Sequence, residues 1–284
     1  MARYTSQSKS ALRHFIDANF SPAFFYPVKG VYYFTTHRYL HPLAKSRLLP
    51  LALLSACVMV VLFLTAYLPI VAVMEIFHRS GSAWVNGTVF VLGIGTLIIT
   101  VLFEALFVDH TQVDIFDAVM IAEGYEHIVR NRRTVSEDID ESDPLKRLGP
   151  REKGAEFAPF SIRQILEFIV LLPLNFVPYA GVPLFLLATG YRAGPLLHRR
   201  YFVLKGMTRK ERNAFIKIKA RRWQFMWYGT VYMILQLIPI LSLLFLLTSA
   251  AGSALWSVHI EREKADQRPL GEDDDLPPEY TDEP

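Results

Sequence analysis

The sequence predicts an all-α polytopic membrane protein, and its composition and its charge-free runs carry that prediction. Hydrophobic residues make up 52% of the 284 residues and charged residues only 20%, against about 25% charged residues in ordinary soluble domains. The hydrophobic residues gather in four runs of 24 to 38 residues without a formal charge, and about 20 suffice for a transmembrane helix. These runs exclude a soluble globular enzyme, and the single cysteine, Cys57, excludes a disulfide scaffold.

The first two runs predict two long transmembrane helices at about residues 48–74 and 83–108. The first run has 27 uncharged residues, and the second has 24 and continues apolar as far as Val108. The preceding residues, 1–47, are polar and aromatic, so we expect a cytoplasmic interfacial segment there rather than a cleaved signal peptide. Asn86 begins a glycosylation pattern at the lumenal edge of the second span, where we expect it to stay unused.

Prolines divide the last two runs, so we expect helical hairpins at about 160–191 and 223–260. A proline inside a helix removes a hydrogen-bond donor and costs roughly 3 kcal/mol. The fourth run has 38 residues and would measure roughly 57 Å as one helix, far more than a bilayer core of ~30 Å. Irregular backbone at membrane depth must be covered by protein or line a wet cavity, which favours a homo-oligomer or close packing. The predicted hairpin breaks are Pro173, Pro178, Gly181, Pro183 and Pro239.

The distribution of positive charge predicts that both hairpins are re-entrant and that both termini are cytoplasmic. Residues 1–47 hold seven Lys/Arg and one acid, and residues 192–222 hold eleven and one; such segments stay on the cytoplasmic side. We expect the second segment to face the bilayer and attract anionic lipids at ~1 kcal/mol per charge, rather than nucleic acid. A basic vestibule for an anion and solvated topology determinants stay open as alternatives. The predicted membrane-facing residues are Arg192, Arg199, Arg200, Lys205, Arg209, Lys210 and Arg212.

Three further segments lie outside the apolar runs. Residues 109–130 predict an amphipathic surface helix, with Val113 and Phe116 on its apolar face and Asp114 and Asp117 elsewhere. Residues 131–159 are charged and poor in apolar side chains, which predicts a mobile cytoplasmic linker. Residues 261–284 carry ten acids and three bases, which predicts a disordered acidic tail.

The tail contains one short recognition motif. Pro277, Pro278 and Tyr280 form a Pro-Pro-x-Tyr sequence, the type of ligand that WW domains bind in an extended polyproline conformation. The partner that this motif predicts is a ubiquitin ligase with WW domains.

No catalytic constellation is visible in the sequence. The eight histidines are scattered, no pair has metal-ligand spacing with a carboxylate partner, and no glycine-rich phosphate loop occurs. We therefore expect no enzymatic activity, no metal and no cofactor.

The order of these parts resembles a known superfamily. An aromatic amphipathic entry, two long spans, an amphipathic helix and two proline-broken hairpins separated by a basic segment are similar to etoposide-induced protein 2.4 and the CysZ-type sulfate permeases. The nearest resemblance is to the fungal Lds/Rrt-type outer spore wall proteins. The matching stretches are 26–34, 41–43, 171–181, 201–207, 211–212, 238–239, 252–256 and Glu261, while the tail and residues 131–159 depart from the family.

The resemblance implies two functions of different kinds. The fungal branch implies a non-enzymatic protein of the endoplasmic reticulum and lipid droplets that supports spore-wall assembly. The bacterial branch implies a permease for sulfate or another anion, although no sulfate-binding residue carries over to a position of this sequence.

Overall fold

The computed structural model describes residues 22–77, 82–106, 110–137, 143–153, 155, 157, 162–238 and 241–266. Helices make up the fold of these residues, as the sequence predicts, and the one bridge between extended residues joins Val135 to Leu148. The first half contains η1 (Pro22–Phe25), α2 (Tyr26–Thr36), η2 (Arg38–Leu40), α3 (His41–Thr65), α4 (Tyr67–Phe77), α5 (Ser82–Leu106), α6 (His110–Ala122) and α7 (Glu126–Arg130). The second half contains α8 (Ile162–Leu171), η3 (Leu172–Phe176), α9 (Gly181–Leu197), α10 (Arg199–Leu204), α11 (Arg209–Lys217), α12 (Lys219–Gln236) and α13 (Ser242–Asp266).

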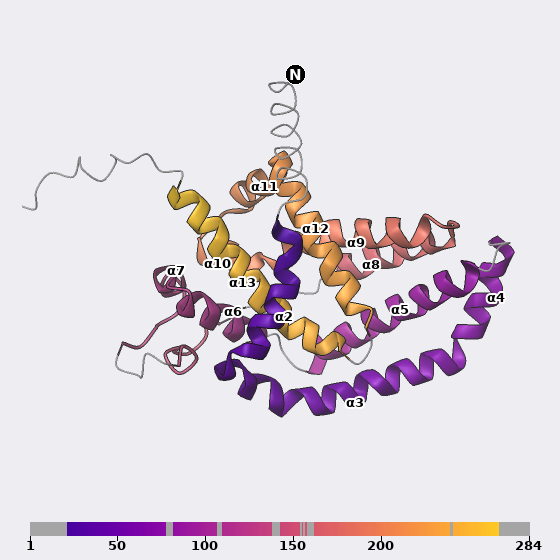
Figure 1. Cartoon of the computed structure of the whole chain (residues 1–284), viewed down its shortest axis with the longest axis horizontal. Coiled ribbons are helices and arrows are strands. Elements are labelled where there is room, and N and C mark those ends of the chain that lie inside the picture. Colours follow the sequence, from indigo (N-terminus) through magenta and orange to yellow (C-terminus); the bar gives the residue numbers. More distant parts are fainter. Residues whose placement is uncertain are drawn as a thin grey trace, which may run out of the picture.

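Helices α3, α4 and α5 form a long arm that extends to one side of the molecule (Figure 1). The sequence predicts one straight span over residues 48–74, but the chain bends by 50° between α3 and α4. The bend follows from Pro69, in the first turn of α4, which has no amide hydrogen for the carbonyl of Thr65 and cannot continue α3.

One straight helix of the described residues is long and apolar enough to cross a membrane. That helix is α5, through its stretch Ser82–Ile99, and the bent pair α3–α4 counts as a second span only if the two helices act together. The bent pair still presents an apolar surface, since Leu64 is 80% exposed and Ile76 is 76% exposed. By length and composition, α5 therefore matches one of the two predicted long spans, and the other stays a prediction.

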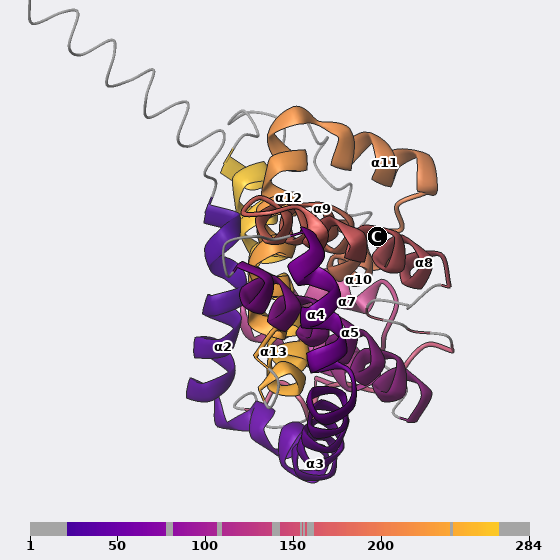
Figure 2. The same ribbon diagram turned by 90° about the vertical axis from the view of Figure 1, so that its right-hand side faces the viewer.

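Helix α13 is the centre of the fold, and it packs against α2, α6, α9 and α12. Figure 2 shows α2 running beside α13 along one edge of the molecule. The two helices approach closely at Gly30 and Gly252, where a Cβ on Gly30 would lie 2.4 Å from the carbonyl oxygen of Thr248. Small residues at this crossing let Tyr26 of α2 stack on the buried indole of Trp256.

The predicted amphipathic helix over residues 109–130 is not a surface helix. Every residue of α6 from Thr111 to Ile121 is buried, and the helix packs against α13. The helix ends at Ala122, and Gly124, with a φ of +85°, turns the chain into the short helix α7. Asp114 and Asp117 break the apolar pattern of α6, so the sequence pattern does not predict this burial.

The described parts of residues 131–159 fold onto α6, so the prediction of a mobile linker is wrong for them. Val135 and Leu148 pair as an isolated bridge, and Phe157 is fully buried against Phe116 of α6. Although the segment has few apolar residues, its arginines hold it in place through ion pairs.

Candidate functional site

The two proline-broken hairpins are the first candidate site. In the first hairpin, Pro173 lies in η3, Pro178 in the following turn, and Pro183 in the first turn of α9. These positions need no helical amide donor, so each proline shapes the tip of the hairpin without interrupting a helix. Gly181 begins α9, where a Cβ would lie 2.3 Å from the carbonyl oxygen of Leu174. The second hairpin joins α12 to α13, and its predicted break, Pro239, lies outside the described residues.

The two hairpins pack against each other through α9 and α12. Glycines on both helices make the crossing tight, because a Cβ on Gly229 would lie 2.0 Å from the carbonyl oxygen of Gly190. The tip of the first hairpin is exposed, with Tyr179 74% and Val177 42% accessible. An exposed apolar tip on a rigid helix pair fits insertion into a bilayer.

Polar and aromatic side chains mark the base of these hairpins. Arg222 donates from Nε to the hydroxyl of Tyr191 at 2.9 Å, and its guanidinium lies 5.2 Å from the centre of that ring. Arg192 pairs with Glu167 at 2.6 Å, and Trp223, next to Arg222 in sequence, is 41% exposed. Aromatic and basic side chains of this kind are typical of a membrane–water interface.

The apolar arms beyond that base are shorter than a bilayer core. The eleven residues from Gly181 to Tyr191 in α9 measure about 16 Å, roughly half of the ~30 Å hydrocarbon thickness. This length supports a hairpin that enters one leaflet and returns, as the sequence analysis proposes.

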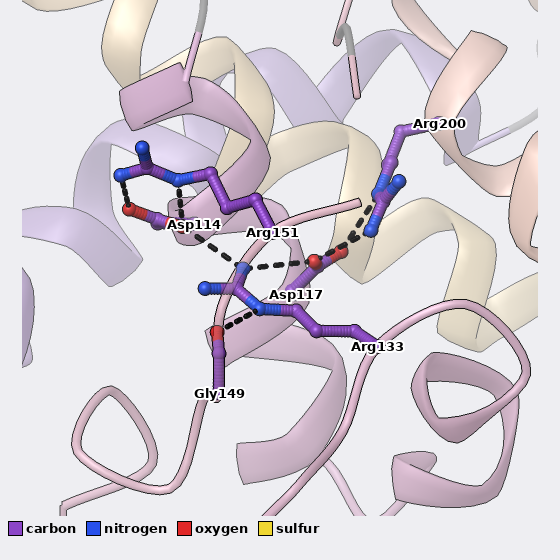
Figure 3. A network of polar contacts seen from close by, with 6 residues as sticks. All are labelled: Asp114, Asp117, Arg133, Gly149, Arg151 and Arg200. Carbon is purple, nitrogen blue, oxygen red and sulfur yellow. Dashed lines mark hydrogen bonds and ion pairs between the residues drawn. The ribbon is translucent and has the colours of Figure 1, made fainter. Parts of the chain in front are cut away.

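A buried carboxylate–arginine network is the second candidate site (Figure 3). Asp114 and Asp117 lie one turn apart on α6, and arginines from three other parts of the chain surround them. Arg200 of α10 donates to both carboxylate oxygens of Asp117, from Nε at 2.9 Å and from Nη2 at 2.7 Å. Arg133 donates from Nη1 to Asp114 at 2.9 Å and to Asp117 at 3.2 Å, and it bridges the two acids.

The network ties the 131–153 segment to the helical core. Arg133 also donates from Nε to the carbonyl oxygen of Gly149 at 2.8 Å. Arg151 makes a two-point contact with Asp114, and its Nε–Oδ1 distance is 2.8 Å. Because these arginines and acids belong to separate segments, the network fixes α6, α10 and the 131–153 segment relative to one another.

Burial and pairing act in opposite directions on the acids of the network. Burial alone would raise the pKa of Asp114, but the hydrogen bonds from Arg151 and Arg133 outweigh it and hold the pKa below its ordinary value. The Asp117 and Arg200 side chains are 0% and 1% exposed. Two charges this far from water depend on each other, because neither can be hydrated if its partner is lost.

The predicted basic segment does not form a single surface. Arg200 is buried in the network, so its prediction as a membrane-facing residue is wrong. Arg192 pairs with Glu167, and Lys205 pairs with Glu261 at 3.1 Å. Of the remaining predicted residues, Arg209 and Lys210 are exposed, whereas Arg199 and Arg212 are half-buried.

A third polar cluster joins α10 to the end of α13. The hydroxyl of Tyr201 donates to Glu261, and Lys264 donates to the same hydroxyl at 2.9 Å and to Glu261 at 3.0 Å. Burial alone would raise the pKa of Glu261, but the hydrogen bonds from Tyr201, Lys264 and Lys205 lower it to about 2. Glu261 is therefore ionised at every physiological pH.

His198 is buried in an aromatic cluster of the core. Its ring lies edge-on to Trp256, Tyr228 and Phe225, at centroid distances of 4.3, 4.7 and 5.3 Å. Its Nδ1 donates to the carbonyl oxygen of Gly194 at 3.1 Å. Burial lowers its pKa to about 3, so the ring is neutral. The described residues contain no cluster of His, Cys, Asp and Glu that is able to hold a metal ion.

Two predicted features are only partly visible. The WW-domain motif of Pro277, Pro278 and Tyr280 lies outside the described residues. Asn86 lies in the second turn of α5 and is 4% exposed, which supports the expectation that the glycosylation pattern is unused.

The sequence alone predicts no role for Asp114, Asp117, Arg133 or Arg151. The signal for the acids was present, because two acids at i and i+3 on an otherwise apolar helix require a buried partner. Nothing in the sequence indicated which arginines would supply it.

Comparison with known proteins identifies the family of the chain. A comparison with curated proteins finds no match, and a comparison with solved structures finds none. A family model described as sulfate transporter CysZ/etoposide-induced protein 2.4 matches residues 35–246, which confirms the superfamily resemblance. Family membership and the apolar helices together are consistent with a membrane protein. From this match over most of its length, the chain belongs to the sulfate transporter CysZ/etoposide-induced protein 2.4 family.

Proposed function

We propose that the chain is a non-enzymatic membrane protein of the endoplasmic reticulum and lipid droplets that supports fungal spore-wall assembly. One observation of the structure carries the non-catalytic, scaffolding part of the proposal. The most deeply buried acids, Asp114 and Asp117, are committed to holding helices and loops together through Arg133, Arg151 and Arg200. The wall-assembly part rests on the resemblance of the motif order to the fungal branch of the family.

The proposed topology has cytoplasmic termini and two re-entrant hairpins. The short apolar arms of α9 and α12, with Tyr191, Arg222 and Trp223 at their base, support insertion from one side of the bilayer. A bilayer pool in the reticulum fits the turn between α4 and α5 better than droplet oil does, because Glu75 at the end of α4 is exposed and charged.

Live imaging tests the proposed site of action. A fluorescent tag at the N-terminus leaves the tail free, and its signal is compared with reticulum and neutral-lipid markers in vegetative and sporulating cells. Reticulum or droplet rings that strengthen on sporulation, with thin spore walls in a deletion strain, are the expected result. A uniform plasma-membrane signal at every stage, with normal walls, would refute the proposal.

An anion permease is the second candidate function, and two observations favour it. The family description names a sulfate transporter. The buried network contains three arginines against two acids, and Nη1 of Arg200 is buried without a hydrogen-bond partner. Such a site has positive charge available for an anion.

Sulfate uptake into proteoliposomes distinguishes the two functions. A permease gives saturable uptake that an Arg200→Gln variant reduces, with correct folding of the variant checked by gel filtration. Flux equal to that of protein-free liposomes, from an oriented and folded preparation, would remove the permease and leave the scaffold.

A further inference from the structure

Helix α11 carries a strongly basic face, which we define as Arg209, Lys210, Arg212 and Lys217. Three of these side chains are exposed and Arg212 is half-buried. No described acid lies within ion-pair distance of them. The one acid of the helix, Glu211, is engaged in a capping box with Thr208.

Neighbouring arginines reinforce the positive charge of this face. Burial together with the nearby charges of Arg199 and Arg209 lowers the pKa of the Arg212 guanidinium. Phe202 of α10 packs edge-on against Phe215 of α11, which holds the two helices side by side. Like charges held together without an acid between them create a positive potential that attracts anionic groups.

The end of α13 lies beside α11. The Lys264 ammonium is 5.4 Å from the ring centre of Phe215, and the Arg221 guanidinium is 4.3 Å from the same ring. Helix α13 ends two residues later, at Asp266. Figure 1 shows α11 and this end of α13 on the same side of the molecule.

The remaining chain has the charge and the length to reach the basic face. Residues 267–284 carry seven acids and one arginine, and four of the acids are consecutive, Glu272–Asp275. Five residues lie between Asp266 and Glu272, and the six residue steps from one to the other span up to about 20 Å, whereas α11 is about 13 Å long. Tethering so close to the surface gives the acids an effective concentration in the millimolar range.

We propose that the basic face of α11 is the docking surface for the chain's own acidic tail, through Glu272–Asp275. The tail is the occupant because it is anionic, begins beside the surface and is always present. An anionic lipid is the competing occupant, and the experiment decides between them.

Zero-length carbodiimide crosslinking of the full chain tests the docking. The protein is placed in phosphatidylcholine nanodiscs at about 0.1 M salt, and peptides joining Lys210 or Lys217 to Glu272–Asp275 are counted by mass spectrometry. These crosslinks are expected, and salt at about 1 M should reduce them about tenfold, because the Debye length falls from ~10 to ~3 Å. Their absence at low salt, or their persistence at high salt, would overturn the proposal.

Variants separate this surface from the rest of the molecule. The double variant Arg209→Gln/Arg212→Gln leaves the reactive lysines in place and should reduce the crosslinks several-fold. The control Arg38→Gln/Lys146→Gln removes the same charge from exposed sites away from α11 and should leave them unchanged. Equal losses in both variants would refute docking on α11. Crosslinks that survive in phosphatidylserine nanodiscs support the tail as the occupant, and crosslinks that vanish there assign the surface to lipid instead.

Discussion

Replacing Asp117 by asparagine should unfold the protein at a much lower temperature. The side chains of Asp117 and Arg200 are 0% and 1% exposed, and two hydrogen bonds join them. Asparagine has nearly the same volume as aspartate, so the change removes the charge and leaves the packing. Arg200 would then be a buried cation without a full counter-charge, since Arg133 already shares the second acid, Asp114.

Removing one partner of a buried ion pair costs about 3–5 kcal/mol. For a chain of this size each kcal/mol lowers the melting temperature by about 2–4 °C, so Asp117→Asn should lower it by about 6–20 °C. Intrinsic tryptophan fluorescence, to which the core residue Trp256 contributes as one of four tryptophans, reports unfolding in detergent. The matched control is Glu137→Gln, because Glu137 is 71% exposed in its pair with Arg130 and should lose less than about 1 kcal/mol.

A second variant tests whether the loss comes from the unpaired charge. The double change Asp117→Leu/Arg200→Met replaces the pair by apolar side chains of similar size, and it should recover most of the stability that Asp117→Asn loses. A melting temperature of Asp117→Asn equal to that of Glu137→Gln would refute the reasoning. A double variant less stable than Asp117→Asn would also refute it.

Three further predictions concern packing, pH and binding. Gly229→Leu should prevent α9 and α12 from packing, because even its Cβ would lie 2.0 Å from the carbonyl oxygen of Gly190. Gel filtration should show aggregation of this variant, whereas the control Ala214→Leu, at an exposed position of α11, should stay monodisperse. The depressed pKa of Glu261, about 2 against an ordinary 4.5, adds stability that is complete above pH ~4.5 and is lost as the pH falls toward 2; urea titrations should therefore show a smaller acid-induced loss in Glu261→Gln than in the wild type, and equal losses would contradict this. Tyr280→Ala should abolish binding of WW domains in a pull-down, whereas Thr281→Ala, next to the motif, should leave it intact; binding by both variants would end the WW-ligand hypothesis.

The sequence predicted the apolar architecture better than the polar one. Charge-free runs located α3, α4 and α5, and the prolines located the tip of the first hairpin, because both signals act within a few residues. Pro69 was an available signal for the bend between α3 and α4. Because the run is apolar throughout, it predicts a single straight helix and hides the effect of this proline.

The carboxylate–arginine network could not be predicted from the sequence, for a physical reason. Arg200 and Asp117 are 83 positions apart, and Arg133 and Asp117 are 16 apart. Charge pairing over such separations depends on the tertiary fold and has no periodicity to detect. Residues 131–159 therefore have the composition of a linker, although Arg133 and Arg151 anchor their described part to the core.

The central place of α13 has a consequence for the order in which the protein is made. This helix is the last of the described chain, yet it supplies the partner surface for α2, the first long helix, through Gly252, Trp256 and their neighbours. A nascent chain that stops before α13 contains its other apolar helices but lacks the helix against which α2 and α6 pack. Until α13 is made, the apolar faces of α2 and α6 stay exposed to the chaperones and proteases that recognise such surface. Synthesis of α13 therefore decides whether the chain is retained or degraded.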